Sequence, residues 1–323
     1  MKTISGTKRT ELSKVRQKFL DYILILFAVG MMIYFSSASQ YFLSIKNFMN
    51  ILSSVSVVGI ISTGMTLVII TRGIDLSVGS IIALTGCVSA ILIVNYSVAW
   101  PIAILATLLI GVLVGGLNGV LITKFNVVPF IATLGTMNII RGLAFILTNG
   151  QAIYVPNEVI TFIGTGKLFN LIPVPAIIML ALFVVFWIIS QYTVFGRNIF
   201  AIGGNVVASR LAGINVKKHT LILYILTGVL SAIAGLVMTG LTSTAMPSAG
   251  DGYNLDTITA VYLGGNSASG GEGSVWRTLM GILIIGILNN GMALLSVPSF
   301  WQTFVKGCLL IVAVIFDMIR RKQ

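Results

Sequence analysis

Long apolar runs, separated by short polar segments, fill most of the chain. Most of these runs reach the roughly 20 residues that an α-helix needs to cross a hydrocarbon core about 30 Å thick. The pattern predicts ten membrane-spanning helices, at about residues 20–36, 48–70, 77–96, 98–123, 129–147, 173–190, 219–243, 254–266, 276–296 and 300–318. We therefore expect an all-α, polytopic membrane protein.

The eighth run, residues 254–266, is short and polar for a complete crossing. It contains Asn254, Asp256, Thr257 and Thr259. Interrupted or polar segments are tolerated at membrane depth only where protein or a cavity covers them. The run therefore predicts a half-helix, or a span that neighbouring helices shield from lipid.

Composition supports the membrane assignment, and the placement of charge gives an orientation. Of 323 residues, 57% are hydrophobic and 9% are charged, whereas soluble domains carry about 25% charged residues. Only Lys46 and Lys167 would lie outside, and Arg141 and Lys306 fall within apolar runs; every other basic residue lies on the opposite side. This positive-inside bias predicts cytoplasmic termini, and it explains the net charge of +12 without a nucleic-acid partner.

The runs divide the chain into a cytoplasmic tail (1–19), a membrane domain (20–318) and a second cytoplasmic tail (319–323). Two longer connections stand out, an outer one at 148–172 and an inner one at 191–218. Alternatively, the first apolar run, with the small residues 36–39 behind it, resembles a cleaved signal peptide. Because the run is at the upper edge of signal-peptide length, we favour a retained first helix.

The membrane domain contains an internal repeat. The stretch GVLVGGLNG at 111–119 recurs as GILIIGILNNG at 281–291, and a Val-Pro pair with a nearby Phe follows each copy. Upstream, residues 62–65 match residues 232–236, so the offset stays near 170 residues, or five predicted helices. An odd number of helices inverts the second copy. The alternative is chance similarity between Gly- and Leu-rich helices, but three matched blocks favour inverted repeats at about 20–147 and 173–318, an arrangement typical of transporters.

Small and polar residues mark particular helix faces. Gly111, Gly115 and Gly119 recur every fourth residue, which predicts close helix packing. The amides of Asn118, Asn289 and Asn290 either form hydrogen bonds across such a contact or line a wet passage.

Asp75 lies between the second and third runs. Its carboxylate either caps the third helix or pairs with Arg72. A third alternative is an ionisable group beside a substrate path.

The inner connection predicts a short helix. Asn205 is a favourable N-cap and Gly213 a favourable residue after the last turn, which leaves about two helical turns between them. A helix that short is unstable alone in water. We therefore expect membrane helix ends or a cytoplasmic partner to hold it.

Candidate chemistry is sparse. The Gly-rich segment 264–273 lacks the Lys-Ser/Thr ending of a P-loop, and the dinucleotide-binding pattern fails as well. Cys87 and Cys308 lie in apolar runs, and His219 is the single histidine. We predict no catalytic residue, no metal site and no cofactor bound by this chain, so any ATP must be hydrolysed by another polypeptide.

Six blocks in order carry a resemblance to a known family: GMTLVII at 64–70, GIDLSVGS at 73–80, FIATLG at 130–135, AIGGN at 201–205, YNLD at 253–256 and LNNG at 288–291. As a set they resemble the ribose-type sugar permeases of bacterial ATP-binding-cassette (ABC) importers, from about residue 40 to the C-terminus. Trp276, Arg277 and Pro298 depart from the pattern, and they leave the sugar unassigned.

The resemblance implies a homodimer in the bacterial inner membrane, a separate ATPase that binds Mg-ATP, and an extracytoplasmic sugar-binding protein. It also implies a monosaccharide substrate, with ribose as the first choice. The segment 203–214 matches the family's coupling helix, with candidate residues Gly203, Gly204, Asn205, Ala208, Ser209, Arg210, Gly213 and Ile214.

The candidate path residues are Asp75, Ser77, Asn118, Thr133, Asn138, Asp256, Asn289 and Asn290. Two other function classes remain as alternatives. A secondary transporter driven by protons or sodium would need buried carboxylates facing the path. Only Asp75 and Asp256 are plausible, and the alternative is that both are helix caps. A membrane enzyme would need paired catalytic groups, and the chain offers none.

Overall fold

The structure, a computed structural model, describes residues 26–321. The predicted tail 1–19, the first residues of the first span and residues 322–323 lie outside this range. Within the described range, seven helices are long and apolar enough to cross a membrane: α2 (Ile45–Ile70), α3 with its π-helical extension η1 (Val78–Ala90 and Ile91–Asn95), α4 (Trp100–Thr123), α5 (Pro129–Thr148), α7 (Val174–Tyr192), α10 (Val216–Thr242) and α12 (Val275–Leu294). Each lies at a predicted span.

The other predicted spans hold the shorter apolar helix Leu26–Ala38, α11 (Tyr253–Leu263) and α13 (Ser299–Arg321), in which Ser299–Ile315 is a second shorter apolar stretch. As expected from its polar sequence, the eighth segment forms a helix of only 11 residues. Its buried side chains include Asp256, Thr257 and Thr259. Neighbouring protein therefore shields it, while the total of ten crossings stays a prediction.

The connections hold small elements. The outer connection contains β1 (Ile153–Tyr154), α6 (Glu158–Thr165), β2 (Lys167–Leu168) and β3 (Ile172–Pro173). Strand β1 pairs antiparallel with β4 (Thr244–Ala245), and β2 pairs antiparallel with β3. The inner connection contains α8 (Val194–Gly204) and α9 (Val206–Leu211). The all-α expectation is confirmed, because the strands in the described chain are two residues long and belong to loops.

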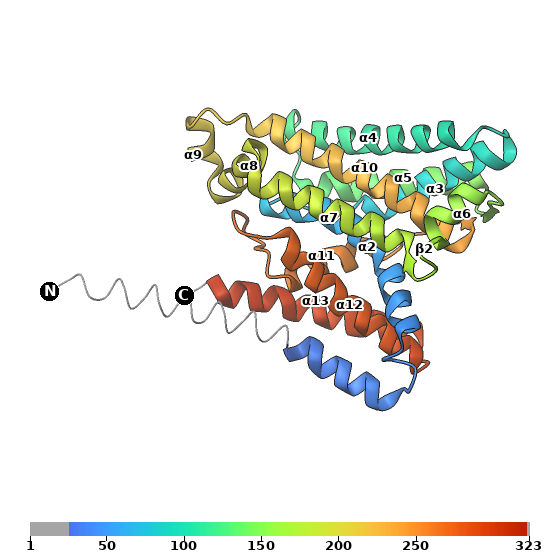
Figure 1. The fold of residues 1–323 in the computed structure, drawn as a ribbon. Coiled ribbons are helices and arrows are strands. Elements are labelled where there is room, and N and C mark those ends of the chain that lie inside the picture. The colour runs from blue at the N-terminus through green and yellow to red at the C-terminus, as the bar shows by residue number, and fades with distance from the viewer. Residues whose placement is uncertain (1–25, 322–323) are drawn as a thin grey trace.

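Helices α2 and α10 form the centre of the bundle (Figure 1) and contact each other. Helix α10 also packs against α3 and α4, and α2 packs against α11 and α12. Exchanging the two proposed repeats converts one set of contacts into the other, as an inverted repeat requires. The repeat itself stays a prediction.

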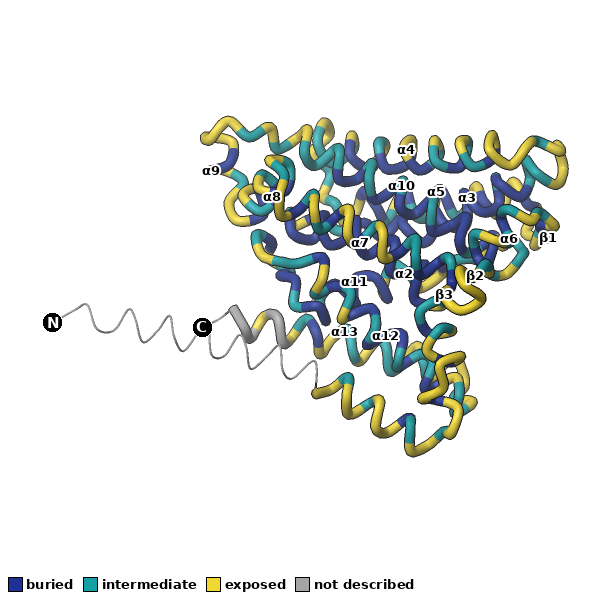
Figure 2. The backbone as a smooth tube through the Cα atoms, in the orientation of Figure 1, coloured by how far each residue is buried: buried dark blue, intermediate teal, exposed yellow. Residues whose placement is uncertain are grey.

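Two ends of the bundle carry different loops. Helices α8 and α9 lie at one end, which we call the α9 end, and α6 with strands β1 and β2 lies at the other, the α6 end (Figure 1). Between them, the turns of α4 alternate between buried and exposed (Figure 2). Its exposed side chains are apolar, among them Ile102, Leu105 and Leu113, as expected of a helix whose outer face contacts lipid.

Glycines set the closest helix contact. A Cβ atom placed on Gly115 would overlap the carbonyl oxygen of Tyr224, and one on Gly111 would overlap that of Gly228. The predicted small-residue face of α4 therefore lies against α10, and the two backbones touch.

This contact predicts a matched pair of outcomes. Gly115→Ala forces the α4 and α10 backbones apart, with an expected cost of about 1–3 kcal/mol. A Cβ on the neighbouring Gly116 would meet only a side-chain carbon of Ile225, at 3.9 Å, so Gly116→Ala serves as the control. The measurement is the temperature at which half of the detergent-solubilised protein leaves the monodisperse peak. Equal midpoints for the two variants would contradict the packing described.

Candidate functional site

Helices α3 and α11 both begin inside the bundle. The hydroxyl of Tyr224 donates to the carbonyl of Ile74, just before α3, at 3.1 Å. At 1.5 Å per residue, Tyr224 lies about 12 Å along α10 from Val216. A Cβ on Gly79, in the first turn of α3, would overlap the carbonyl oxygen of Gly250, just before α11. The starts of α3 and α11 therefore meet inside the bundle.

Four of the predicted path residues surround the start of α3. The Asp75 carboxylate accepts hydrogen bonds from the Ser77 amide at 2.9 Å and from its hydroxyl at 2.6 Å. The Asn118 amide donates to the Ser77 hydroxyl at 2.9 Å and accepts from Thr136 at 2.6 Å. The hydroxyl of Thr133 donates to the carbonyl of Pro129 at 2.8 Å.

Asp75 does not cap the first amides of α3, because the N-cap is Ser77 and makes no side-chain cap bond; the Asp75 carboxylate instead closes a local turn with Ser77 just before the helix. Asn118 forms hydrogen bonds across a helix contact. The second Asp75 oxygen, Oδ2, is buried and has no hydrogen-bond partner among the residues described. The alternative of an Asp75–Arg72 pair is wrong, because the Arg72 guanidinium binds two carbonyl groups elsewhere.

A cavity of about 290 Å³ lies between α3, α5 and the segment 250–255. Its polar lining residues are Ser80, Asn138, Arg141, Asp251 and Asn254, and Leu76, Met137 and Leu255 supply apolar walls. Only Asn138 of these was a predicted path residue. Arg141 had a visible signal, a charge within an apolar run. Ser80, Asp251 and Asn254 had none, because they reach the cavity only through the meeting of α3 and α11.

Arg141 shapes one wall of this cavity. Its Nη1 donates to the carbonyls of Pro247 at 2.8 Å and Ala249 at 2.7 Å. The guanidinium thereby holds the descending segment before α11 against α5. Carbonyl groups that have no helical partner in this segment are satisfied by a charged donor.

The remaining predicted path residues lie apart from this cavity. Asp256 forms an ion pair with Lys306 of α13 at 2.9 Å, and the Asp256 side chain is only 7% exposed. The expectation that Asp256 caps α11 is wrong, because its N-cap is Gly252 and makes no side-chain bond. Asn290 exchanges two hydrogen bonds with Asn47 of α2, at 2.8 and 2.9 Å. The neighbouring Asn289 has a buried oxygen without a partner among the described residues.

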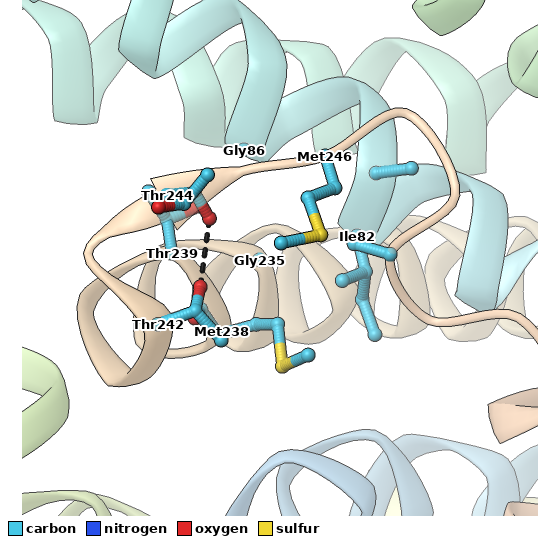
Figure 3. A pocket seen from close by; sticks show the side chains of 10 residues that line it. Ile82, Gly86, Gly235, Met238, Thr239, Thr242, Thr244 and Met246 are labelled. Carbon is cyan, nitrogen blue, oxygen red and sulfur yellow. Dashed lines mark hydrogen bonds between the residues drawn. The ribbon is translucent and has the colours of Figure 1, made fainter. Parts of the chain in front are cut away.

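A second cavity lies beside α10 near the α6 end (Figure 3). Its volume is about 30 Å³, and Met238 and Met246 line it together with Thr239, Thr242 and Thr244. The Thr242 hydroxyl donates to the Thr244 carbonyl at 2.7 Å across this space (Figure 3). A space this small holds about one water molecule, so it cannot pass an organic substrate.

The inner connection folds as predicted. The Asn205 side chain accepts from the amides of Val207 and Ala208, each at 3.0 Å. Gly213 follows the helix at φ +82°, a left-handed conformation that favours glycine. The Ser209 hydroxyl is buried and donates to the Asn205 carbonyl at 2.8 Å. After the last turn of α9, the Gly213 amide donates to the Arg210 carbonyl, and the Ile214 amide donates to the Ser209 carbonyl.

Three backbones meet where α8 ends, at a contact we call the junction. Arg72 donates to the carbonyls of Gly203 and Gly204, each at 2.7 Å. The Gly271 amide donates to the Ile70 carbonyl at 2.9 Å. A Cβ on Gly203 would overlap the Ile70 carbonyl and the Gly271 amide. A cation at the free carbonyls of a helix C-terminus is favourable, and the glycines permit the close approach.

Comparisons with known proteins identify a family and several relatives. The family described as branched-chain amino acid transport system / permease component matches residues 47–314. The chain is 42% identical to the ribose import permease protein RbsC of Escherichia coli (strain K12), over 98% of each chain. It is 34% identical to the xylose transport system permease protein XylH of Haemophilus influenzae (strain ATCC 51907 / DSM 11121 / KW20 / Rd), over 94% of this chain and 97% of the relative. It is 38% identical to the L-arabinose ABC transporter permease protein AraH of Azospirillum brasilense, over 87% and 83%. No solved structure matches the chain.

The Asp256–Lys306 pair predicts a double-variant result. Lys306→Met leaves the buried carboxylate without its cation, with an expected destabilisation of about 3–5 kcal/mol. Adding Asp256→Leu removes the unpaired charge and should restore most of the loss. Apparent melting temperatures of the purified protein measure both effects. A double variant no more stable than Lys306→Met would mean that the pair does not hold α11 to α13.

Proposed function

The chain belongs to the family of branched-chain amino acid transport system permease components, and we propose that it is the permease subunit of an ABC importer for a monosaccharide, with a pentose such as ribose as the first substrate to test. As a permease component it is a transport subunit and not itself an enzyme. The observation that carries the sugar assignment is the near-full-length likeness to permeases named for ribose, xylose and L-arabinose, all of which are pentoses.

The partners of the permease follow from this proposal. Hydrolysis of Mg-ATP belongs to a separate ATPase, because the chain carries no ATP-binding motif. The α9 end, where Arg197, Arg210, Lys217 and Lys218 of the inner connection lie, faces the cytoplasm. The α6 end faces outward, where a sugar-binding protein delivers its ligand. Two copies of the chain form the complete passage in the bacterial inner membrane.

Helix α9 has the features of an ATPase-docking element. Val207 and Leu211, four residues apart and hence on one helical face, are 66% and 85% exposed. Exposed apolar residues on a short capped helix fit a groove in a partner protein. Ser209 of the same helix is buried, and α9 contacts α8 and α10.

The junction provides the route from α9 to the membrane interior. Arg72 links the end of α8 to the segment that leads directly into α3. Gly271 belongs to the loop between α11 and α12, and its bond to Ile70 brings that loop to the same point. A displacement of α8 and α9 by an ATPase therefore acts on the segment before α3 and on the loop after α11.

The ion-coupled alternative receives less support. Asp256 is neutralised by Lys306, and Asp75 accepts two hydrogen bonds from Ser77. Neither carboxylate belongs to the lining of the 290 Å³ cavity. A proton- or sodium-driven transporter needs carboxylates that alternate between exposure to the two sides.

Reconstitution tests the proposed function. In vesicles that contain the permease with its ATPase, radiolabelled ribose should accumulate only when ATP and the loaded binding protein are both supplied. The control omits the ATPase and imposes a proton or sodium gradient. Accumulation in that control would reject the ABC assignment and revive the ion-coupled one.

A single charge on α9 tests the docking element. Leu211→Asp places a carboxylate on the exposed apolar face, and it should reduce co-purification of the ATPase by at least about tenfold, because a charge desolvated in an apolar contact is costly. Phe169→Asp is the matched control, since Phe169 is 86% exposed at the opposite end of the bundle. Equal ATPase recovery with both variants would exclude α9 as the principal contact.

A further inference from the structure

We propose that the 290 Å³ cavity is a transient binding site for the transported substrate, an uncharged, hydroxyl-rich molecule of monosaccharide size. This inference rests on the proposed function and assigns a position to it. The cavity lies where α3 and α11 begin, between α3, α5 and the segment 250–255. In transporters, helix ends that lie inside the membrane commonly frame the substrate.

Ser80 supplies the first argument. Ser80 is fully buried, and its hydroxyl has no hydrogen-bond partner among the described residues. Buried hydroxyl groups are almost always bonded. The other buried serines of α3 follow that rule or join the Asp75 network: Ser89 donates to the Gly86 carbonyl at 2.7 Å, and Ser77 donates to Asp75. A substrate hydroxyl in the cavity would satisfy Ser80.

Two amides extend the set of bonding groups. The nitrogen of Asn138 donates to the Leu134 carbonyl at 3.1 Å, which leaves its oxygen as an acceptor. Among the described residues, the nitrogen of Asn254 donates only to the Met137 sulfur, at 3.7 Å, and thioether sulfur is a weak acceptor. These groups, with the Ser80 hydroxyl, match the alternating donors and acceptors of a sugar.

The charges favour a neutral molecule. Arg141 and Asp251 line the same cavity with opposite signs, and the structure records no ion pair between them in its described part. Both hydrogen bonds that Arg141 forms with described residues use Nη1. A vicinal pair of hydroxyls can bridge donor and acceptor groups of this kind, whereas an ionic substrate would be repelled by one of them.

Size separates this cavity from the others. About 290 Å³ is at the lower end of the range for small-molecule sites, as suits a single sugar ring. The 30 Å³ cavity is too small. A groove of about 860 Å³ between the helix Leu26–Ala38, α2 and α12 is lined mainly by apolar side chains such as Met32, Phe48 and Ile284, which offer no partners to hydroxyls.

Uptake by the complete transporter tests the site. In vesicles with the ATPase and binding protein, Ser80→Ala and Asn138→Leu should each lower the initial rate of ribose uptake about threefold to tenfold, the effect of losing one hydrogen bond. ATP hydrolysis stimulated by the loaded binding protein should stay at the wild-type rate, since neither residue belongs to the junction. Ser89→Ala, in the same helix, is the control and should leave both rates unchanged.

A labelling experiment reports on the cavity without any transport. In a chain with Cys87→Ala and Cys308→Ser, Asn138→Cys is treated with a small methanethiosulfonate reagent. Millimolar D-ribose should slow its modification at least about threefold, and should leave modification of Gln151→Cys, in the outer connection, unaffected. Uptake that is normal in both cavity variants, or labelling that ribose does not slow, would overturn the site. If the wild-type complex imports no sugar, the proposed function fails, whereas protection by ribose would still locate the sugar in the cavity.

Discussion

The absence of water in the membrane interior is the constraint on which this structure depends. A backbone amide or carbonyl that leaves a helix at that depth must find a partner within the protein. Two helices of this chain, α3 and α11, begin inside the bundle, and each start is satisfied differently. Before α3, the Asp75 carboxylate bonds Ser77, which connects to Asn118. Before α11, the Arg141 guanidinium binds two carbonyls. The polar groups in the interior of this apolar protein are therefore needed because α3 and α11 begin there.

On the proposed function, the starts of α3 and α11 also form the path of mechanical coupling. A continuous helix transmits motion along its whole length, whereas a helix that begins inside the bundle can move with the segment that precedes it. Arg72 ties the segment before α3 to the end of α8, and the glycine contacts bring the loop after α11 to the same place. The three backbones at the junction are in close contact, so a movement of one displaces the others. Packed contacts transmit displacement and do not absorb it. A partner that moved α9 would thus act on the walls of the 290 Å³ cavity.

Sequence reasoning succeeded where local physics decides the structure. Lipid enforces long apolar helices, so the seven long spans could be predicted within a few residues. Cap chemistry is equally local, which is why Asn205 and Gly213 marked the ends of α9 correctly. The errors concern partners far apart in the chain. Asp256 was interpreted as a possible cap of α11, but it binds Lys306, fifty residues later in the sequence. Asp75 was considered as a partner for Arg72, whose hydrogen-bond partners lie on α8. Ser80 and Asn254 face one cavity only because α3 and α11 meet, and no spacing in one sequence encodes that meeting.

On the proposed function, the modest polarity of the 290 Å³ cavity is an advantage for transport. A transported molecule must bind well enough to enter and weakly enough to leave, as in channels. A site with a full set of charged, bidentate contacts would hold the sugar and slow its release. The cavity instead offers one hydroxyl, two amides and a pair of opposite charges among apolar walls. Such a site excludes ions and apolar molecules but distinguishes poorly between sugars that differ only in the orientation of one hydroxyl. Fine selectivity then has to come from the protein that delivers the ligand, and the permease needs only enough affinity to keep the sugar ring in the passage while the helices around it move.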